Sequence, residues 1–174
     1  HSPAHDEVKM ISVKIAQGAK PGEGGVLPAR KVTPEIAAIR GIPVGQDAIS
    51  PDHHKDINSV TELLDFITHV KKLTGKPVGF KTIYSRQEDV EELCREIKKR
   101  PIQFAPDFIC LDGGEGGTGA APEALMDHVG MSIRESSPMV AETMVRHGLK
   151  DRIKLIPSGK LVLPEDIAWA LAMG

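Results

Sequence analysis

The chain has 174 residues, 40% of them apolar, a formal net charge of −2 and only 3% aromatic residues. One domain with a sizeable core is therefore expected, and neither a basic nucleic-acid surface nor aromatic stacking of a ligand is indicated. No apolar stretch reaches the roughly 18 residues of a membrane-spanning helix, so no membrane segment is expected.

The start of the chain and its cysteines bear on its cellular setting. His1 is not an initiator Met and the residues after it resemble no signal peptide, which suggests a cut inside a longer chain. Cys94 and Cys110 lie in a helical and a strand pattern and belong to no metal-ligand cluster. Two buried thiols in a reducing compartment, and hence a cytoplasmic protein, are predicted.

The first predicted strand, residues 10–16, leads into a loop that contains four glycines between residues 18 and 25. Lys14, Gln17 and Lys20 lie in or beside this turn. Glycine lets a ligand approach the main chain closely, and lysines with backbone N–H groups suit an anion. The sequence therefore predicts an anion-binding loop here, with a surface loop that binds nothing as the alternative.

Two helices are predicted next. Thr33 before Pro34 is an N-cap followed by proline in the first turn, and it predicts a short helix to about residue 40. Ser59 with Glu62 has the spacing of a capping box, and the helix that it starts ends at Gly75.

The loop between these helices contains His53, His54 and Asp56. The spacing invites a metal interpretation, but adjacent histidines rarely point at one metal and no third ligand is evident. A loop structure or a substrate gate is favoured over zinc, and no metal site is predicted.

The second clear strand, residues 77–83, carries Lys81 among apolar neighbours. A lysine in such a strand is costly unless it meets an anion or a ligand, although a lysine near the strand end can also reach solvent. Over a flavin ring, this ammonium group would stabilise the negative charge of the reduced pyrimidine edge.

A charged helix over residues 86–100, whose charges predict a solvated face, precedes a short, nearly all-apolar strand at 107–112. Five glycines in residues 113–119 follow, more than a simple turn needs. They suggest that a flat or bulky ligand lies against the backbone, with a flexible lid that holds no ligand as the alternative. Thr118 is expected to donate a hydrogen bond there, and Glu115 to orient substrate.

Helices are predicted from Pro122 and over 135–147, before a strand at 152–157 and a last helix at 163–173. The tight loop Ser158, Gly159 and Lys160 joins that strand to the last helix. Backbone N–H groups in a late strand-to-helix loop suit a phosphate, with a plain left-handed turn as the alternative.

Strands that alternate with helices predict an α/β protein with parallel pairing, and the special residues follow every strand. That pattern favours a (β/α)8 TIM barrel over an open dinucleotide-binding sheet. Because only four strands are clear, residues 1–174 are interpreted as a single partial barrel domain.

The whole series of segments resembles the FMN-binding domain of glutamate synthase, especially the shorter glutamate-synthase-like proteins that lack a glutaminase domain. The segments that carry the general resemblance are Lys14–Gly25, Leu27–Pro28, Lys31–Ile36, Arg40–Gly45, Ile49–Asp56 and Gly116–Ala120. Those typical of the shorter branch are Asp112–Pro122, Asp127–Met131 and Pro157–Lys160.

The resemblance implies a flavoprotein that reduces 2-iminoglutarate, formed from 2-oxoglutarate and ammonia or glutamine-derived nitrogen, to L-glutamate. It implies substrate binding by Lys14, Gln17 and Lys20, and flavin contact by Lys81. It also implies FMN binding by Gly116, Gly117 and Thr118 and by the loop of Ser158, Gly159 and Lys160. Electrons would arrive from a donor subunit or ferredoxin through a 3Fe-4S cluster whose cysteine ligands lie outside this chain.

One pair of residues departs from the family pattern, and two other functions stay open. The larger synthases carry His-Asp where this chain has Gly114 and Glu115. An FMN barrel that oxidises 2-hydroxy acids would need a histidine–arginine pair, for which His147 and Arg152 are poor candidates. An inactive anion-binding fragment is the third possibility, and exposed strand edges would favour a homo-oligomer.

Overall fold

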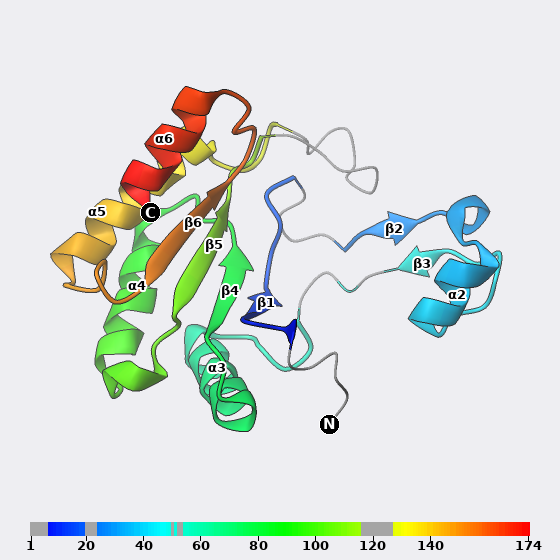
Figure 1. Cartoon of the computed structure of the whole chain (residues 1–174), viewed down its shortest axis with the longest axis horizontal. Coiled ribbons are helices and arrows are strands. Elements are labelled where there is room, and N and C mark those ends of the chain that lie inside the picture. Colours follow the sequence, from blue (N-terminus) through cyan, green and yellow to red (C-terminus); the bar gives the residue numbers. More distant parts are fainter. Residues whose placement is uncertain (1–6, 20–23, 50, 52–53, 116–126) are drawn as a thin grey trace.

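A four-stranded parallel sheet forms the centre of the protein, as a computed structural model shows (Figure 1). The structure describes residues 7–19, 24–49, 51, 54–115 and 127–174. The strands are β1 (Ile11–Lys14), β4 (Val78–Thr82), β5 (Phe108–Asp112) and β6 (Lys154–Ser158), and they lie in the order β1-β4-β5-β6. Strands that are neighbours in this sheet thus also follow one another along the chain, as in a (β/α) barrel.

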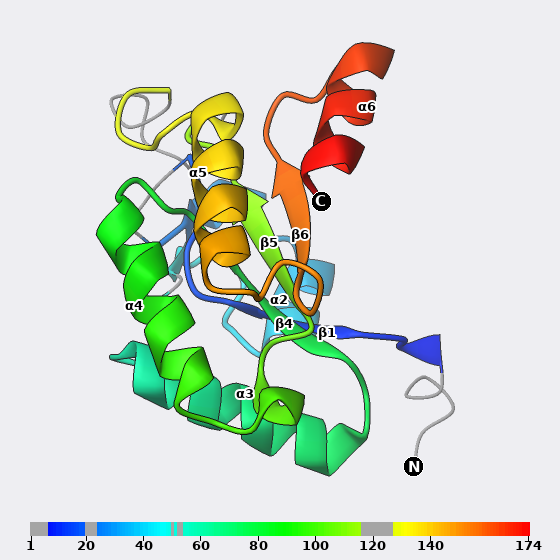
Figure 2. The ribbon, with the colours of Figure 1, turned by 90° about the vertical axis from the view of Figure 1, so that its left-hand side faces the viewer.

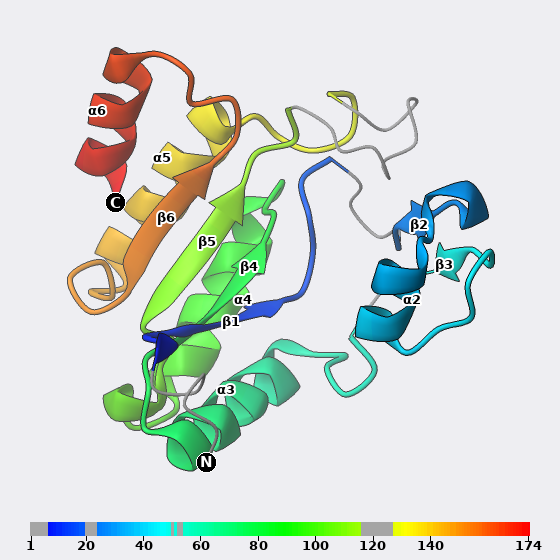
Figure 3. The same ribbon diagram turned by 45° about the vertical axis from the view of Figure 1, so that its right-hand side comes forward.

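Helices cover one face of this sheet. They are α3 (Val60–Thr74), α4 (Gln87–Lys98), α5 (Ile133–Arg146) and α6 (Pro164–Met173). Figure 2 views the molecule from the side of α4 and α5, which lie in front of the strands, and Figure 3 shows the opposite face, in front of which none of these four helices lies. The two faces of the sheet therefore have different environments.

Side-chain alternation along the strands explains which residues form the core. Phe80, Ile109 and Leu111 point toward the helices and are almost fully buried, whereas Lys81 and Cys110 alternate with them and belong to the open face. Burial of such apolar side chains, each worth about 1.5–3 kcal/mol, holds the helices on the sheet.

A small separate unit lies beside the main body in Figure 1. It joins a two-residue antiparallel pair, β2 (Val26–Leu27) with β3 (Ala48–Ile49), to α2 (Pro34–Arg40). Its own core is small and comprises Val32, Ala37 and Ala48. Short 3-10 turns at Ala29–Lys31 and Ile102–Phe104 complete the described elements.

The main predicted elements are confirmed, with shifted ends. The Thr33 and Ser59 hydroxyls accept backbone N–H groups of Ile36 and Glu62 as N-caps. The predicted start of α5 was two residues late, and Ser158 ends β6 rather than opening the loop. The β2–β3 pair was not predicted, and the helix expected from Pro122 lies outside the described residues.

The fold class is confirmed as α/β with a parallel sheet, which is consistent with a partial barrel. None of the helices in the described part of the chain is both long and apolar enough to cross a membrane.

One predicted surface charge also has a structural role. Glu91 on α4 accepts hydrogen bonds from Arg146 at 2.7 Å and from His147 at 2.6 Å, which come from the end of α5. These bonds, that of His147 first, hold the pKa of Glu91 below its usual range. Glu91 keeps 23% of its side chain exposed on this charged face and also links two neighbouring helices.

Asp107 anchors the start of β5. Its Oδ2 accepts the backbone N–H of Val78 at 2.8 Å and lies 2.9 Å from Lys71 Nζ, and its Oδ1 accepts from Arg152 at 3.2 Å. Burial raises the pKa of this carboxyl, but the bonds from Lys71, Val78 and Arg152 outweigh burial and bring it below its ordinary value. One carboxylate therefore ties α3 and two strand starts together.

We expect Asp107→Asn to lower the free energy of unfolding by about 1–3 kcal/mol, because buried donors lose their charged acceptor. A depressed pKa in the folded state means that this contribution is present above about pH 4 and is lost as the pH falls further. Urea titrations at pH 7 and pH 3 measure both effects. Asp65→Asn, which removes an exposed ion pair with Arg100, should cost less than about 1 kcal/mol, and an equal loss in both variants would contradict the assignment.

Candidate active site

The parallel register brings predicted site residues together at the carboxyl edge of the sheet. Lys14, the last residue of β1, is the register partner of Lys81 on β4. Asp112, the last residue of β5, is the partner of Ser158 on β6. In a parallel α/β sheet this edge is where ligands bind. Two of the three lysines predicted to share one rim, Lys14 and Lys81, therefore lie on neighbouring strands at this edge.

The first lysine is already ordered by its own loop. Lys14 Nζ donates a hydrogen bond of 2.9 Å to Gln17 Oε1, and Lys14 is exposed. An ammonium group has three N–H donors, so this contact orients Lys14 while leaving donors for an anionic ligand. Gln17 keeps its amide N–H groups for the same ligand.

The second lysine has a buried carboxylate as its partner. Lys81 Nζ lies 3.0 Å from Asp112 Oδ1, and the side chains are 33% and 9% exposed respectively. Asp112 Oδ2 also accepts the backbone N–H of Gly18 at 3.1 Å. The carboxylate thus connects β4 to the loop after β1.

Close backbone contact explains one of the predicted loop glycines. A Cβ on Gly18 would lie 1.8 Å from the carbonyl oxygen of Gly113. Gly18 has no positive φ angle, so the position requires glycine for space rather than for conformation. The loops after β1 and β5 therefore lie backbone to backbone.

The loops after β5 and β6 are also joined. Gly113 N–H donates to the carbonyl oxygen of Ser158 at 2.7 Å. Gly159 has a φ of 154° and Lys160 a φ of 41°, a region that favours glycine. Lys160 Nζ lies 3.2 Å from Asp127 Oδ1 on the surface. Backbone of positive φ, the alternative to a phosphate site in this loop, is present, and Lys160 is paired to an aspartate. Phosphate binding by this loop stays a prediction.

Glu115 caps a helix that the sequence did not associate with it. Both of its carboxylate oxygens accept the backbone N–H of Ile133, the first residue of α5, at 2.9 Å. Negative charge is favourable at a helix N-terminus. Glu115 thus connects the loop after β5 to α5, and its predicted contact with substrate remains a prediction.

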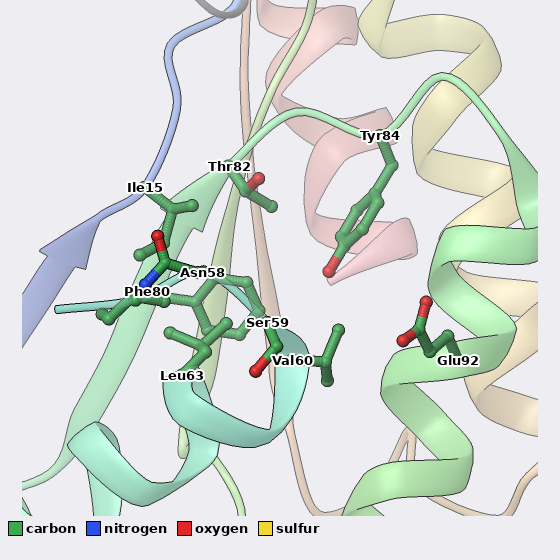
Figure 4. A pocket seen from close by; sticks show the side chains of 10 residues that line it. Ile15, Asn58, Ser59, Val60, Leu63, Phe80, Thr82, Tyr84 and Glu92 are labelled. Carbon is green, nitrogen blue, oxygen red and sulfur yellow. The ribbon is translucent and has the colours of Figure 1, made fainter. Parts of the chain in front are cut away.

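A hollow of about 580 Å³ lies on the helix side of the sheet (Figure 4). Phe80 and Thr82 of β4 line it together with Val60 and Leu63 from the start of α3. Burial, with help from neighbouring acidic groups, raises the pKa of Tyr84 at its rim. Because Phe80 and Thr82 face this hollow, Lys81 between them faces the opposite side of the strand.

The two thiols differ in exposure. Cys94 is buried, and burial raises its pKa to about 11, as predicted for a core thiol. Cys110, in register with Lys81 on the open face, is only partly buried, so the prediction of two buried thiols was wrong for it. Burial still raises its pKa, although Lys81 opposes this, so both thiols are protonated near neutral pH.

The histidine–arginine pair of the alternative 2-hydroxy acid oxidase receives no geometric support. Arg152 pairs with Asp107 at the amino-terminal end of the sheet, and His147 binds Glu91 at the end of α5. They lie away from the carboxyl edge and do not form a catalytic pair there. His54 packs edge-on against Phe66, with ring centres 5.1 Å apart, and the described residues contain no group of three candidate metal ligands.

Several predicted site residues lie outside the described part of the chain: Lys20, Gly116, Gly117, Thr118 and His53. Their assignments stay predictions. Sequence reasoning did not predict a site role for Asp112, which lies directly before the glycines of this loop. A carboxylate that ends a nearly all-apolar strand was the available signal, because such a group needs a partner.

Comparison with known proteins assigns the chain to a family. Residues 4–174 match the family model described as the conserved region in glutamate synthase. The chain therefore belongs to the glutamate synthase family.

Individual relatives agree with this assignment. The chain is 39% identical over 169 residues to the glutamate synthase large subunit-like protein YerD of Bacillus subtilis, which covers 97% of this chain and 32% of that protein. It is 40% identical over 166 residues to the archaeal glutamate synthase [NADPH] of Methanocaldococcus jannaschii, covering 94% of this chain and 31% of that protein. The chain thus spans about a third of the length of these relatives.

We expect Gly18→Ala to separate the loops after β1 and β5, since no flexible side chain is available to relieve the clash with Gly113. Hydrogen–deuterium exchange of residues 15–19 should accelerate about tenfold, the equivalent of roughly 1.4 kcal/mol in local opening free energy. Gly75→Ala is the control. A Cβ there meets nothing within 4 Å, and the strain that it causes at a φ of 65° is confined to the end of α3, so exchange of residues 15–19 should stay as in the wild type. Unchanged exchange in Gly18→Ala would rule out the close contact.

Proposed function

We propose that this chain forms part of the active site of an FMN-dependent glutamate synthase, which reduces 2-iminoglutarate, formed from 2-oxoglutarate and ammonia, to L-glutamate. The observation that carries the proposal is the pairing of Lys14 and Lys81 in register at the carboxyl edge of the sheet. Membership of the glutamate synthase family supports it.

The charges at this edge fit the reactants. 2-Oxoglutarate has two carboxylates, and Lys14 beside Gln17 supplies an ammonium and an amide for one of them. Lys20 is proposed to bind the other. This arrangement fixes the substrate carbon relative to the open face, which is the positioning that hydride transfer requires.

The residues present also fit FMN. Lys81 is partly exposed on the open face, where its charge suits an anionic ring edge. Gly116, Gly117 and Thr118 are proposed to contact the ring, and the loop of Ser158, Gly159 and Lys160 to hold the phosphate. When bound, the flavin supplies the hydride.

Electron supply requires further parts. Cys94 lies in α4 and Cys110 in β5, and burial raises the pKa of both thiols. The ligands of a 3Fe-4S cluster are therefore proposed to be other cysteines. The names of relatives include NADPH, which supports a pyridine nucleotide as the electron source, delivered through a donor subunit or ferredoxin. A cytoplasmic location and a homo-oligomer are proposed with it.

The proposal is tested by substituting Lys14 in the full-length protein. Loss of a charge-assisted bond to a carboxylate costs about 1.5–3 kcal/mol, so Lys14→Ala should weaken 2-oxoglutarate binding by roughly 10- to 150-fold in isothermal titration calorimetry. Lys154→Ala is a matched control, since Lys154 is an exposed lysine at the start of β6, on the edge of the sheet opposite to Lys14. We expect its affinity to stay within about twofold of the wild type.

Two results would end the proposal. One is a purified wild-type protein that shows no flavin absorbance even after incubation with FMN. The other is 2-oxoglutarate binding that Lys14→Ala leaves unchanged.

A further inference from the structure

We propose that Asp112 is a positioning residue of this site, which sets the Lys81 ammonium and the Gly18 loop relative to one another through a single buried carboxylate. The inference rests on the proposed function, since it assigns the purpose of the contact to substrate and flavin binding. It adds a residue that neither the family resemblance nor the relatives' names assign.

The two oxygens of Asp112 have different partners. Oδ1 lies 3.0 Å from Lys81 Nζ on β4, and Oδ2 accepts the Gly18 N–H at 3.1 Å. The carboxylate itself comes from β5, and its side chain is only 9% exposed. One ion pair and one hydrogen bond hold this buried carboxylate, because loss of either contact leaves a buried charged oxygen uncompensated.

The loop that Asp112 holds is the one that carries the proposed substrate residues. Gly18 follows Gln17, whose Oε1 accepts a hydrogen bond of 2.9 Å from Lys14 Nζ. The Gly18 backbone also lies against Gly113, which follows Asp112. A shift of Asp112 would therefore move both the proposed substrate loop and Lys81.

Comparison with Asp107 shows that Asp112 is more than a structural anchor. Asp107 lies just before β5 and Asp112 is its last residue, and each contacts one lysine and one backbone N–H of another segment. Lys71, the partner of Asp107, is 16% exposed and also donates to the carbonyl oxygen of Ala105. Lys81 is 33% exposed on the open face, so N–H donors of its ammonium group stay available for a ligand.

The pair also sets the local charge. With Asp112 ionised, the Lys81–Asp112 pair is neutral, and its positive end faces the open side. Asp112→Asn would leave an uncompensated positive charge there, which favours an anionic reduced ring. The midpoint potential of bound flavin should therefore shift in the positive direction, and Lys81→Met should shift it in the negative direction.

Asp112→Asn tests the inference with Asp107→Asn as the matched control at the other end of β5. An asparagine has no charge to pair with Lys81 and only one acceptor oxygen to serve both Lys81 and the Gly18 N–H, so exchange of the Gly18 amide in the full-length protein should accelerate about tenfold. A redox titration with indicator dyes should show the positive shift in Asp112→Asn. Asp107→Asn should lower stability and leave both the Gly18 exchange and the potential as in the wild type.

The outcomes separate this inference from the proposed function. In the wild type itself, a Gly18 amide that exchanges at the unprotected rate would overturn the inference, even if Asp112→Asn does not fold. Equal potential shifts in the two variants, or none in either, would overturn the positioning role of Asp112. If the wild type holds no flavin, the proposed function fails, and the exchange measurements still decide whether Asp112 holds the loop.

Discussion

The hydrogen-bonded register of four parallel strands is the constraint on which the site depends. Because β1 and β4 run in the same direction, the ends of both strands reach the same edge, and Lys14 meets Lys81 there. The next pair of strands brings Asp112 beside Ser158 in the same way. Residues that lie 67 and 46 positions apart in the chain thereby become neighbours without any specialised loop.

The two faces of the sheet differ in burial, and this difference lets charged groups lie on the strands without a large loss of stability. On the helix side, apolar side chains such as Ile109 and Leu111 are completely buried and stabilise the fold. On the other face, Lys81 keeps partial exposure and a carboxylate partner, so its charge is not stranded. Stability and charge chemistry therefore occupy opposite faces of the same strands, separated by the alternation of side chains.

The sequence predicted what local patterns determine. Apolar runs identified the four strands, and Thr33 and Ser59 marked helix starts because their caps involve residues three positions away. Contacts between distant segments were not predictable in this way. The β2–β3 pair has only two residues in each strand, too few for a pattern, and the role of Asp112 depends on Lys81 and Gly18 reaching it from other segments.

A closed barrel remains a prediction, since β1 and β6 are the edges of the described sheet and closure depends on what pairs with them. The positions of the site residues do not depend on that pairing. Its three anchoring groups, Lys14, Lys81 and Asp112, belong to three adjacent strands whose register is already set. Strands added at either edge would change how much water reaches the open face, and hence the strength of its charges, while the positions of those groups would stay fixed by β1, β4 and β5.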